Sequence, residues 1–222
     1  MCFSATASFG ASALLSIIGV ATLKQSKTTP QKFLACIPLI FAVQQFAEGF
    51  VWLSLTNPEY KYLHHIAMYA FLVFAEVVWP VYVPLAVLIN EKKKGRKKIL
   101  AAFLMVGMLT GGYLFFCLFY YPSEAIALKD HIRYQQGFPW ADVRWGGIFY
   151  FIPTVISSFV VSIKQMRLFG IIMTVSCIFT RIFYSDYIVS IWCFFAAILS
   201  VVLLSIIIGM NKDEEAIPIA VG

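Results

Sequence analysis

A series of long apolar stretches constrains the fold of this chain more than any other feature. A helix that crosses a bilayer needs about 20 mainly apolar residues. The 222 residues are 61% hydrophobic and 13% charged, whereas soluble domains carry about 45–50% apolar and about 25% charged residues. Apolar stretches of the required length cover residues 5–23, 33–56, 62–90, 98–121, 146–163, 166–184 and 188–209.

The sequence therefore predicts an all-α fold, a polytopic membrane bundle of about seven transmembrane helices. These helices form a single domain over residues 1–210, followed by a short tail at 211–222. The third stretch is longer than one span requires. Because proline removes a helix hydrogen bond and clashes with the preceding turn, Pro80 and Pro84 predict a bend in that helix.

The distribution of lysine and arginine predicts the orientation of the bundle, because cytoplasmic loops carry an excess of both. The connections after the first, third and fifth stretches are the basic ones, through Lys24, Lys27, Lys32, the run 92–98, Lys164 and Arg167. We therefore expect the N-terminus outside and the C-terminal tail in the cytoplasm. The net charge of +6 follows from this asymmetry, so the expected partner is the lipid bilayer and not a nucleic acid.

The only long connection, residues 122–145, is predicted to be an outer loop. Tyr120, Tyr121, Trp140 and Trp145 flank or lie in it, and Trp and Tyr are enriched at membrane–water interfaces. Connections of this length are often lids or binding elements. A plain solvated loop is the alternative interpretation.

Glu48 is the most informative polar residue, because ionisable side chains within spans are costly and mark sites or pathways by default. It lies in the second stretch, about 12 Å from its outer end at 1.5 Å per residue. Gln44, Glu48 and Trp52 share one helix face. The structural alternative is a protonated carboxyl that bonds Gln44 or Gln45. Glu76, deeper in the third stretch, could instead bind backbone groups freed by the proline bend.

Several other reactive residues map to the outer third of the predicted bundle. Cys2 precedes the first helix, His131 lies in the outer loop, and Arg181 and Cys193 lie near outer helix ends. A cysteine, a histidine and a carboxylate at one site would suit zinc or copper. Alternatively, Cys2 could be a thiolate nucleophile activated by His131. The five cysteines show no CxxC or zinc-ribbon spacing, so neither a disulfide framework nor a structural zinc site is expected.

The chain resembles an uncharacterised family of small bacterial multi-pass membrane proteins. The resemblance lies in Met1-Cys2-Phe3-Ser4-Ala5-Thr6-Ala7-Ser8-Phe9, in residues 44–52, in Trp79-Pro80, in His131-Ile132-Arg133-Tyr134 and in residues 190–197. It implies an integral protein of a bacterial inner membrane, of unknown activity, with Cys2, Ser4, Glu48, His131 and Trp192 in the family pattern.

Three functional hypotheses follow. The first is a membrane enzyme with an outer-leaflet-facing site of Cys2, Glu48 and His131, acting on a lipid or apolar small molecule. The second is a proton- or ion-linked carrier or sensor that uses Glu48, and the third is a structural or assembly subunit. Cys2, Glu48 and His131 are the predicted catalytic residues and metal ligands. The predicted substrate-binding residues are Gln44, Gln45, Trp52, Arg133, Tyr134, Arg181 and Trp192.

Overall fold

The computed structural model describes residues 4–129, 131–139, 146–183 and 195–216. The chain is mostly helical, as predicted. Its first half consists of α1 (Ala5–Gln25), α2 (Thr29–Ala35), α3 (Ile37–Thr56), the 3-10 segment η1 (Pro58–Leu63), α4 (His64–Leu72), the π-helical segment η2 (Val73–Val78), α5 (Trp79–Asn90) and α6 (Lys94–Tyr120). Strands β1 (Ser123–Leu128) and β2 (His131–Gln136) follow, then α7 (Gly146–Phe151), the π-helical segment η3 (Ile152–Ile156), α8 (Ser157–Val160), α9 (Met166–Phe183) and α11 (Ala196–Ala216).

In the described part of the chain, five helical segments are long and apolar enough to cross a membrane: Ala5–Gln25, Thr29–Thr56, Pro58–Asn90, Lys94–Tyr120 and Met166–Phe183. Gly147–Val160 and Ala196–Lys212 are shorter apolar helices. They coincide with the fifth and seventh predicted stretches. Five long apolar helices are compatible with a multi-pass membrane protein, and a total of seven spans stays a prediction.

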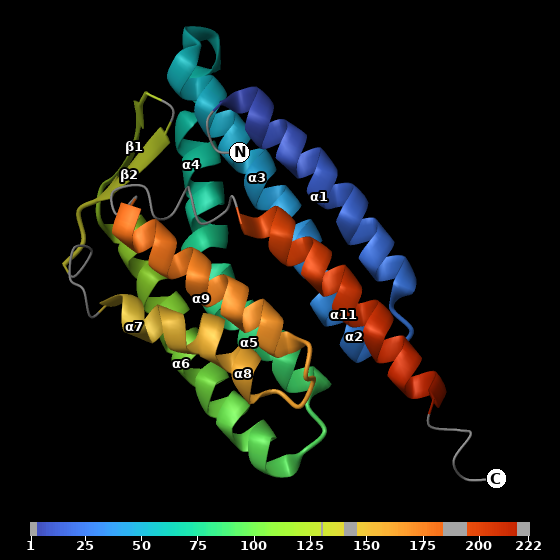
Figure 1. The fold of residues 1–222 in the computed structure, drawn as a ribbon. Coiled ribbons are helices and arrows are strands. Elements are labelled where there is room, and N and C mark those ends of the chain that lie inside the picture. The colour runs from blue at the N-terminus through green and yellow to red at the C-terminus, as the bar shows by residue number, and fades with distance from the viewer. Residues whose placement is uncertain (1–3, 130, 140–145, 184–194, 217–222) are drawn as a thin grey trace.

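The bundle has two recognisable ends (Figure 1). At the hairpin end, α1 begins, α3 and α6 end, and the β1–β2 hairpin stands beside α4. At the opposite, lysine end, α1 is followed by α2, α5 by α6 and α8 by α9. The segments around these turns carry Lys24, Lys27, Lys32, the basic run 92–98, Lys164 and Arg167. All the connections that the sequence predicts to be cytoplasmic therefore share one end.

Helices α1 and α3 pack antiparallel through small side chains of α1. The Ser12 hydroxyl donates to the Ala42 carbonyl at 2.8 Å. A Cβ added at Gly19 would overlap the side chain of Leu39. Small residues at such contacts let two helix backbones approach closely, as is common between helices in membranes.

The bend predicted at Pro80 is accommodated by η2, which immediately precedes it. Pro80 has no N–H, so a carbonyl in the preceding turn loses its intrahelical partner. The Tyr150 hydroxyl, on α7, donates to the Ala75 carbonyl at 2.5 Å. Helix α6 approaches the same bend, because a Cβ at Gly107 would overlap the Pro80 carbonyl oxygen. Tyr150 therefore supplies the donor to this carbonyl, and a backbone contact of Glu76 at the bend stays a prediction.

The predicted outer loop contains an antiparallel β-hairpin, which the sequence analysis did not anticipate. Its register pairs Ser123 with Gln136 and Leu128 with His131. Lys129 in the connecting turn has φ 53°, the left-handed conformation that two-residue hairpin turns require. One face of the hairpin, with Ala125 and Ile132, is buried against the helices.

Glu91 joins two connections at the lysine end. Its carboxylate accepts hydrogen bonds from the backbone N–H groups of Lys92 and Lys93 at 2.8 and 2.7 Å. It also accepts from the Ser162 N–H at 2.6 Å and the Ser162 hydroxyl at 2.7 Å. Burial by itself raises the Glu91 pKa, but these four hydrogen bonds to the charged form outweigh it and hold the pKa below its ordinary value.

Candidate functional site

The polar side chains of α3 are fully enclosed by the bundle. Glu48 is 0% exposed and Gln44 and Gln45 are each 1% exposed. The Gln45 amide donates from Nε2 to Glu48 Oε2 at 3.1 Å. The Glu48 carboxyl therefore has the glutamine partner that the structural interpretation of this residue predicts, on the same face of the same helix.

Gln44 links α3 to the helix beyond the bend. Its Oε1 accepts a hydrogen bond from Trp79 Nε1 at 2.7 Å. The Trp79 ring also packs on Phe41 with centroids 4.1 Å apart. A buried indole N–H needs an acceptor, so this bond fixes how α3 and α5 align along their length.

Glu76, in η2, is only 8% exposed. Glu48 lies about one helical turn after Gln44, and Glu76 lies about one turn before Trp79. Because α3 and the η2–α5 segment run antiparallel, both steps lead towards the hairpin end. The two carboxyls therefore lie at about the same level of neighbouring helices. The Gln136 side chain, on β2, interacts with the Glu76 carboxyl, but within the described part of the chain Glu76 Oε2 has no hydrogen-bond partner.

The hairpin register sorts the predicted loop residues onto two faces. Tyr134 pairs with Ala125, on the buried face, and its ring stacks on Phe71 of α4 with centroids 4.8 Å apart. His131 pairs with Leu128, and Arg133 with Ile126. Since side chains alternate along a strand, Arg133 lies on the opposite face, whereas His131 begins β2 beside the turn and its Nδ1 atom is buried. Arg133 is exposed and His131 is partly buried.

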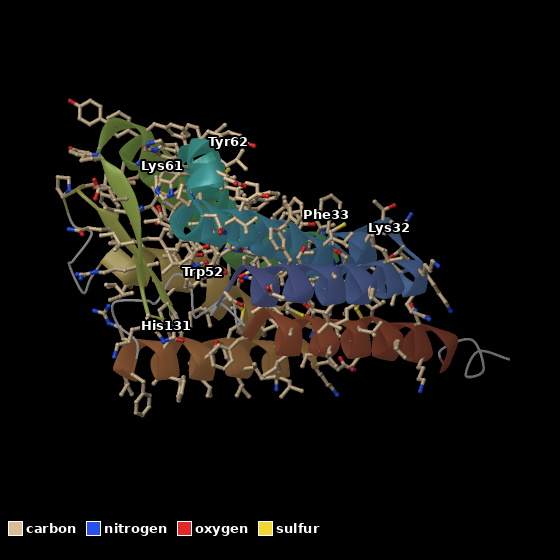
Figure 2. The ribbon with its side chains drawn as sticks, turned by 90° about the horizontal axis from the view of Figure 1, so that it is seen from above. Lys32, Phe33, Trp52, Lys61, Tyr62 and His131 are labelled. Carbon is tan, nitrogen blue, oxygen red and sulfur yellow. The ribbon has the colours of Figure 1, made fainter. Side chains whose placement is uncertain are left out.

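An apolar group at the hairpin end, here called the hairpin-end cluster, joins the chain segments that carry the predicted catalytic residues. Its buried members are Ala47, Val51, Trp52, Ala67, Met68, Phe71, Leu72, Leu118, Ala125 and Ile132. Ala47 adjoins Glu48, and Ile132 adjoins His131. Ala5, at the start of α1, packs against the same cluster. Figure 2 shows Trp52 and His131 toward the same end of the bundle.

The structure does not bring three further predicted residues into this group. Cys2 and Trp192 lie outside the described residues, as does Cys193. Arg181 is exposed near the end of α9. The structure therefore brings together the surroundings of Glu48, His131 and Trp52, and leaves Arg181 at the surface.

Comparison with protein families assigns the chain. A model named Family of unknown function (DUF6629) matches residues 1–216. The chain belongs to this family. The uncharacterised family that the sequence resembles is thereby confirmed as a family of unknown function. Comparison with curated proteins and with solved structures found no match.

The DUF6629 match spans the helical bundle and the hairpin but names no chemistry. Among residues 4–129, 131–139, 146–183 and 195–216, no group of three or more His, Cys, Asp or Glu could hold a metal ion. The predicted ligand set includes Cys2, which lies outside these ranges, so that prediction stays untested. Cys36, Cys117 and Cys177 are free thiols.

Sequence reasoning missed Gln136 and Tyr150, which contact the Glu76 region of this DUF6629 chain. Gln136 could have been found from the alternation of Ile132, Tyr134 and Gln136 along one strand face. No local signal identifies Tyr150, because its partner lies 75 residues away in the sequence.

Proposed function

We propose that this protein is an integral membrane enzyme with a site at the hairpin end that acts on a lipid or an apolar small molecule. Cys2, Glu48 and His131 carry the site. The proposed chain crosses a bacterial inner membrane about seven times, with the N-terminus outside and the tail in the cytoplasm. The five long apolar helices and the gathering of lysines at one end support this topology.

The hairpin-end cluster is the observation that carries the proposal. Ala5 packs against this cluster, which includes Ala47 and Ile132, the chain neighbours of Glu48 and His131. Cys2 is three residues from Ala5, and a chain spans at most about 3.3–3.6 Å per residue. The thiol therefore has a reach of about 10 Å from a point on the cluster that also contains the chain neighbours of Glu48 and His131.

In the proposed chemistry, His131 takes the proton of the Cys2 thiol, and the thiolate attacks an acyl carbonyl carbon of the substrate. The bond from that carbon to the leaving oxygen breaks, and His131 returns the proton to the leaving alcohol. Water then hydrolyses the thioester and releases a carboxylic acid. Glu48 stabilises the charged imidazole, a role that carboxylates have beside catalytic histidines.

The environment of the site suits an apolar substrate. Trp52 and Tyr134 belong to or pack against the hairpin-end cluster, and aromatic side chains supply large apolar contact areas with a polar tip. Gln44, Gln45, Arg133 and Trp192 complete the proposed binding residues. Arg181, exposed near the end of α9, is the proposed contact for an anionic headgroup.

The test measures thiol reactivity and metal content on the same detergent-purified samples. A variant that retains Cys2 and replaces Cys36, Cys117, Cys177 and Cys193 with Ser is alkylated across pH 5–9, with and without His131→Ala. We expect alkylation of Cys2 at neutral pH to slow by at least about tenfold in His131→Ala, since the thiolate is the nucleophile. A variant that retains only Cys36 is the control and should not respond to His131→Ala.

Elemental analysis separates the two chemical forms of the site. Stoichiometric zinc or copper that is lost in both Cys2→Ser and His131→Ala supports the same trio as metal ligands. Cys2 alkylation that is identical with and without His131, together with no metal loss in either variant, overturns the proposed site.

A further inference from the structure

Glu48 on α3 and Glu76 on η2 lie at about the same depth along two neighbouring helices. We propose that Glu48, Gln45 and Glu76 form a binding site for a hard metal cation, of the alkali or alkaline-earth class, within the bundle. This site goes beyond the proposed enzyme, since it needs neither Cys2 nor His131.

The Gln44–Trp79 hydrogen bond aligns the helices that carry the site. With Gln44 and Trp79 joined at 2.7 Å, the next turn towards the hairpin end places Glu48 on α3 and Glu76 on η2 at one depth. Ala47 belongs to the hairpin-end cluster and Ala75 packs against it, and α3 contacts η2.

Oxygen acceptors without donors gather in this layer. Gln45 donates its Nε2 to Glu48, which leaves the carbonyl end of the same amide beside the carboxyl. Within the described residues, neither Gln45 Oε1 nor Glu76 Oε2 has a hydrogen-bond partner, and the buried donors Trp52 Nε1 and Gln136 Nε2 lack one as well. Both side chains are at least nine-tenths buried. A buried polar group without a partner is costly, and a cation at this layer would satisfy the two oxygens.

A metal cation satisfies these atoms better than a proton does. A proton on one carboxyl provides one O–H donor, whereas a cation contacts several oxygens at once. Two carboxylates would neutralise a divalent cation, and one carboxylate beside one protonated carboxyl would neutralise a monovalent cation, which matters where burial of an isolated charge is very costly. Carboxylate and amide oxygens are the ligands that hard cations take, while cysteine and imidazole suit softer metals.

The backbone bend next to Glu76 does not depend on a hydrogen bond from the Glu76 side chain. The Tyr150 hydroxyl already occupies the Ala75 carbonyl, so Glu76 is not needed to complete the bend at Pro80. Gln136 brings a side-chain amide from the hairpin to the Glu76 carboxyl. Because Gln136 Nε2 makes no hydrogen bond within the described residues, the Glu76 carboxyl remains available for a ligand.

The test is cation-dependent thermal stability of the full chain in detergent at pH 8. Sodium chloride and calcium chloride are compared with choline chloride at equal ionic strength, for wild type, Glu76→Gln, Glu48→Gln and Glu124→Gln. Glu124 is an exposed carboxyl on β1 and serves as the matched control. Binding at about 100 times Kd should raise the Tm by about 5 °C or more.

We expect sodium or calcium to raise the Tm of wild type and of Glu124→Gln, and both responses to be lost in Glu76→Gln. Glu76→Asp, which keeps a carboxylate, should retain a weakened response even if Glu48→Gln fails to fold. A Tm that responds to pH but to neither cation overturns the proposal, as does an unchanged response in Glu76→Gln. Cys2→Ser and His131→Ala should respond like wild type, so failure of the enzyme proposal is distinguished from failure of this one.

Discussion

The hydroxyl of Tyr150 donates a hydrogen bond to the backbone carbonyl of Ala75, five residues before Pro80. In a π-helical segment the N–H of residue i bonds the carbonyl of residue i−5, so Ala75 is the carbonyl that Pro80 cannot serve. A side chain from α7 thus completes the hydrogen bonding of a bent helix in a region where apolar surroundings make an unmet carbonyl costly.

Tyr150→Phe should therefore destabilise the protein. Removing the hydroxyl leaves the Ala75 carbonyl without its donor, and we expect a loss of about 1–3 kcal/mol in the free energy of unfolding. The matched control is Tyr113→Phe, since the Tyr113 hydroxyl bonds the Pro139 carbonyl at an exposed site. Thermal unfolding in detergent measures both. Equal small losses in the two variants would show that the Tyr150 hydroxyl has no special role at the bend.

Gln44→Leu should disrupt the alignment of α3 and α5. The Trp79 N–H would lose its acceptor in a buried position, at a cost of about 1–3 kcal/mol. Gln135→Leu, at an exposed position on β2, is the control and should have little effect. Unfolding followed by Trp fluorescence tests the prediction, and wild-type stability in Gln44→Leu would contradict it.

Gly107→Ala should be poorly tolerated, whereas Gly112→Ala on the same helix should not. A Cβ at Gly107 would overlap the Pro80 carbonyl oxygen, a backbone atom that cannot rotate away, while a Cβ at Gly112 meets nothing within 4 Å. Overpacking of this kind costs about 1–3 kcal/mol, and alanine otherwise stabilises a helix by about 0.5–1 kcal/mol relative to glycine. Opposite signs in the two measured Tm shifts are expected; shifts of the same sign and size would contradict the close contact.

Glu91 should make stability fall in acid. Burial raises the Glu91 pKa, but the hydrogen bonds from Lys93, Ser162 and Lys92 together lower it by more. The pKa in the folded protein therefore lies below the ordinary 4.5. A carboxyl whose pKa is depressed by folding contributes stability that is fully present above the unfolded pKa and is lost as pH falls through the folded one. Unfolding measured from pH 6 to pH 3 should therefore show a steeper decline in wild type than in Glu91→Gln.

Glu59→Gln is the control for this pH series, because Glu59 is exposed in η1. It should keep the acid-dependent decline of wild type. A Glu91→Gln variant with the same decline as wild type would show that the hydrogen bonds to Glu91 do not couple protonation to folding.

The sequence was sufficient to predict the helices but not their partners. Composition and the length of the apolar stretches predict helices, because lipid requires every backbone group to be satisfied within its own segment. Pro80 correctly marked the irregular turn. The acceptor of the Trp79 N–H and the donor to the Ala75 carbonyl lie on other helices, and no periodicity of a single stretch encodes which helices become neighbours.

The hairpin was within reach of sequence reasoning. Residues 123–128 and 132–136 alternate between buried and exposed positions, with Lys129 at the turn. The aromatic and charged residues of this segment are also typical of a loop at the membrane interface, which is the structure that the sequence analysis predicts. For the site, Glu48 and its Gln45 partner follow from helix spacing, whereas the shared level of Glu48 and Glu76 depends on how two helices align and needed the structure.

The hydrogen bonds to Glu91 impose an order on biogenesis. Lys92 and Lys93 emerge from the ribosome directly after Glu91, but Ser162 follows only 71 residues later. A nascent chain that has inserted α1 to α6 therefore still carries a half-capped carboxylate in its basic connection. That connection gains its remaining two hydrogen bonds only when the segment after α8 has been made.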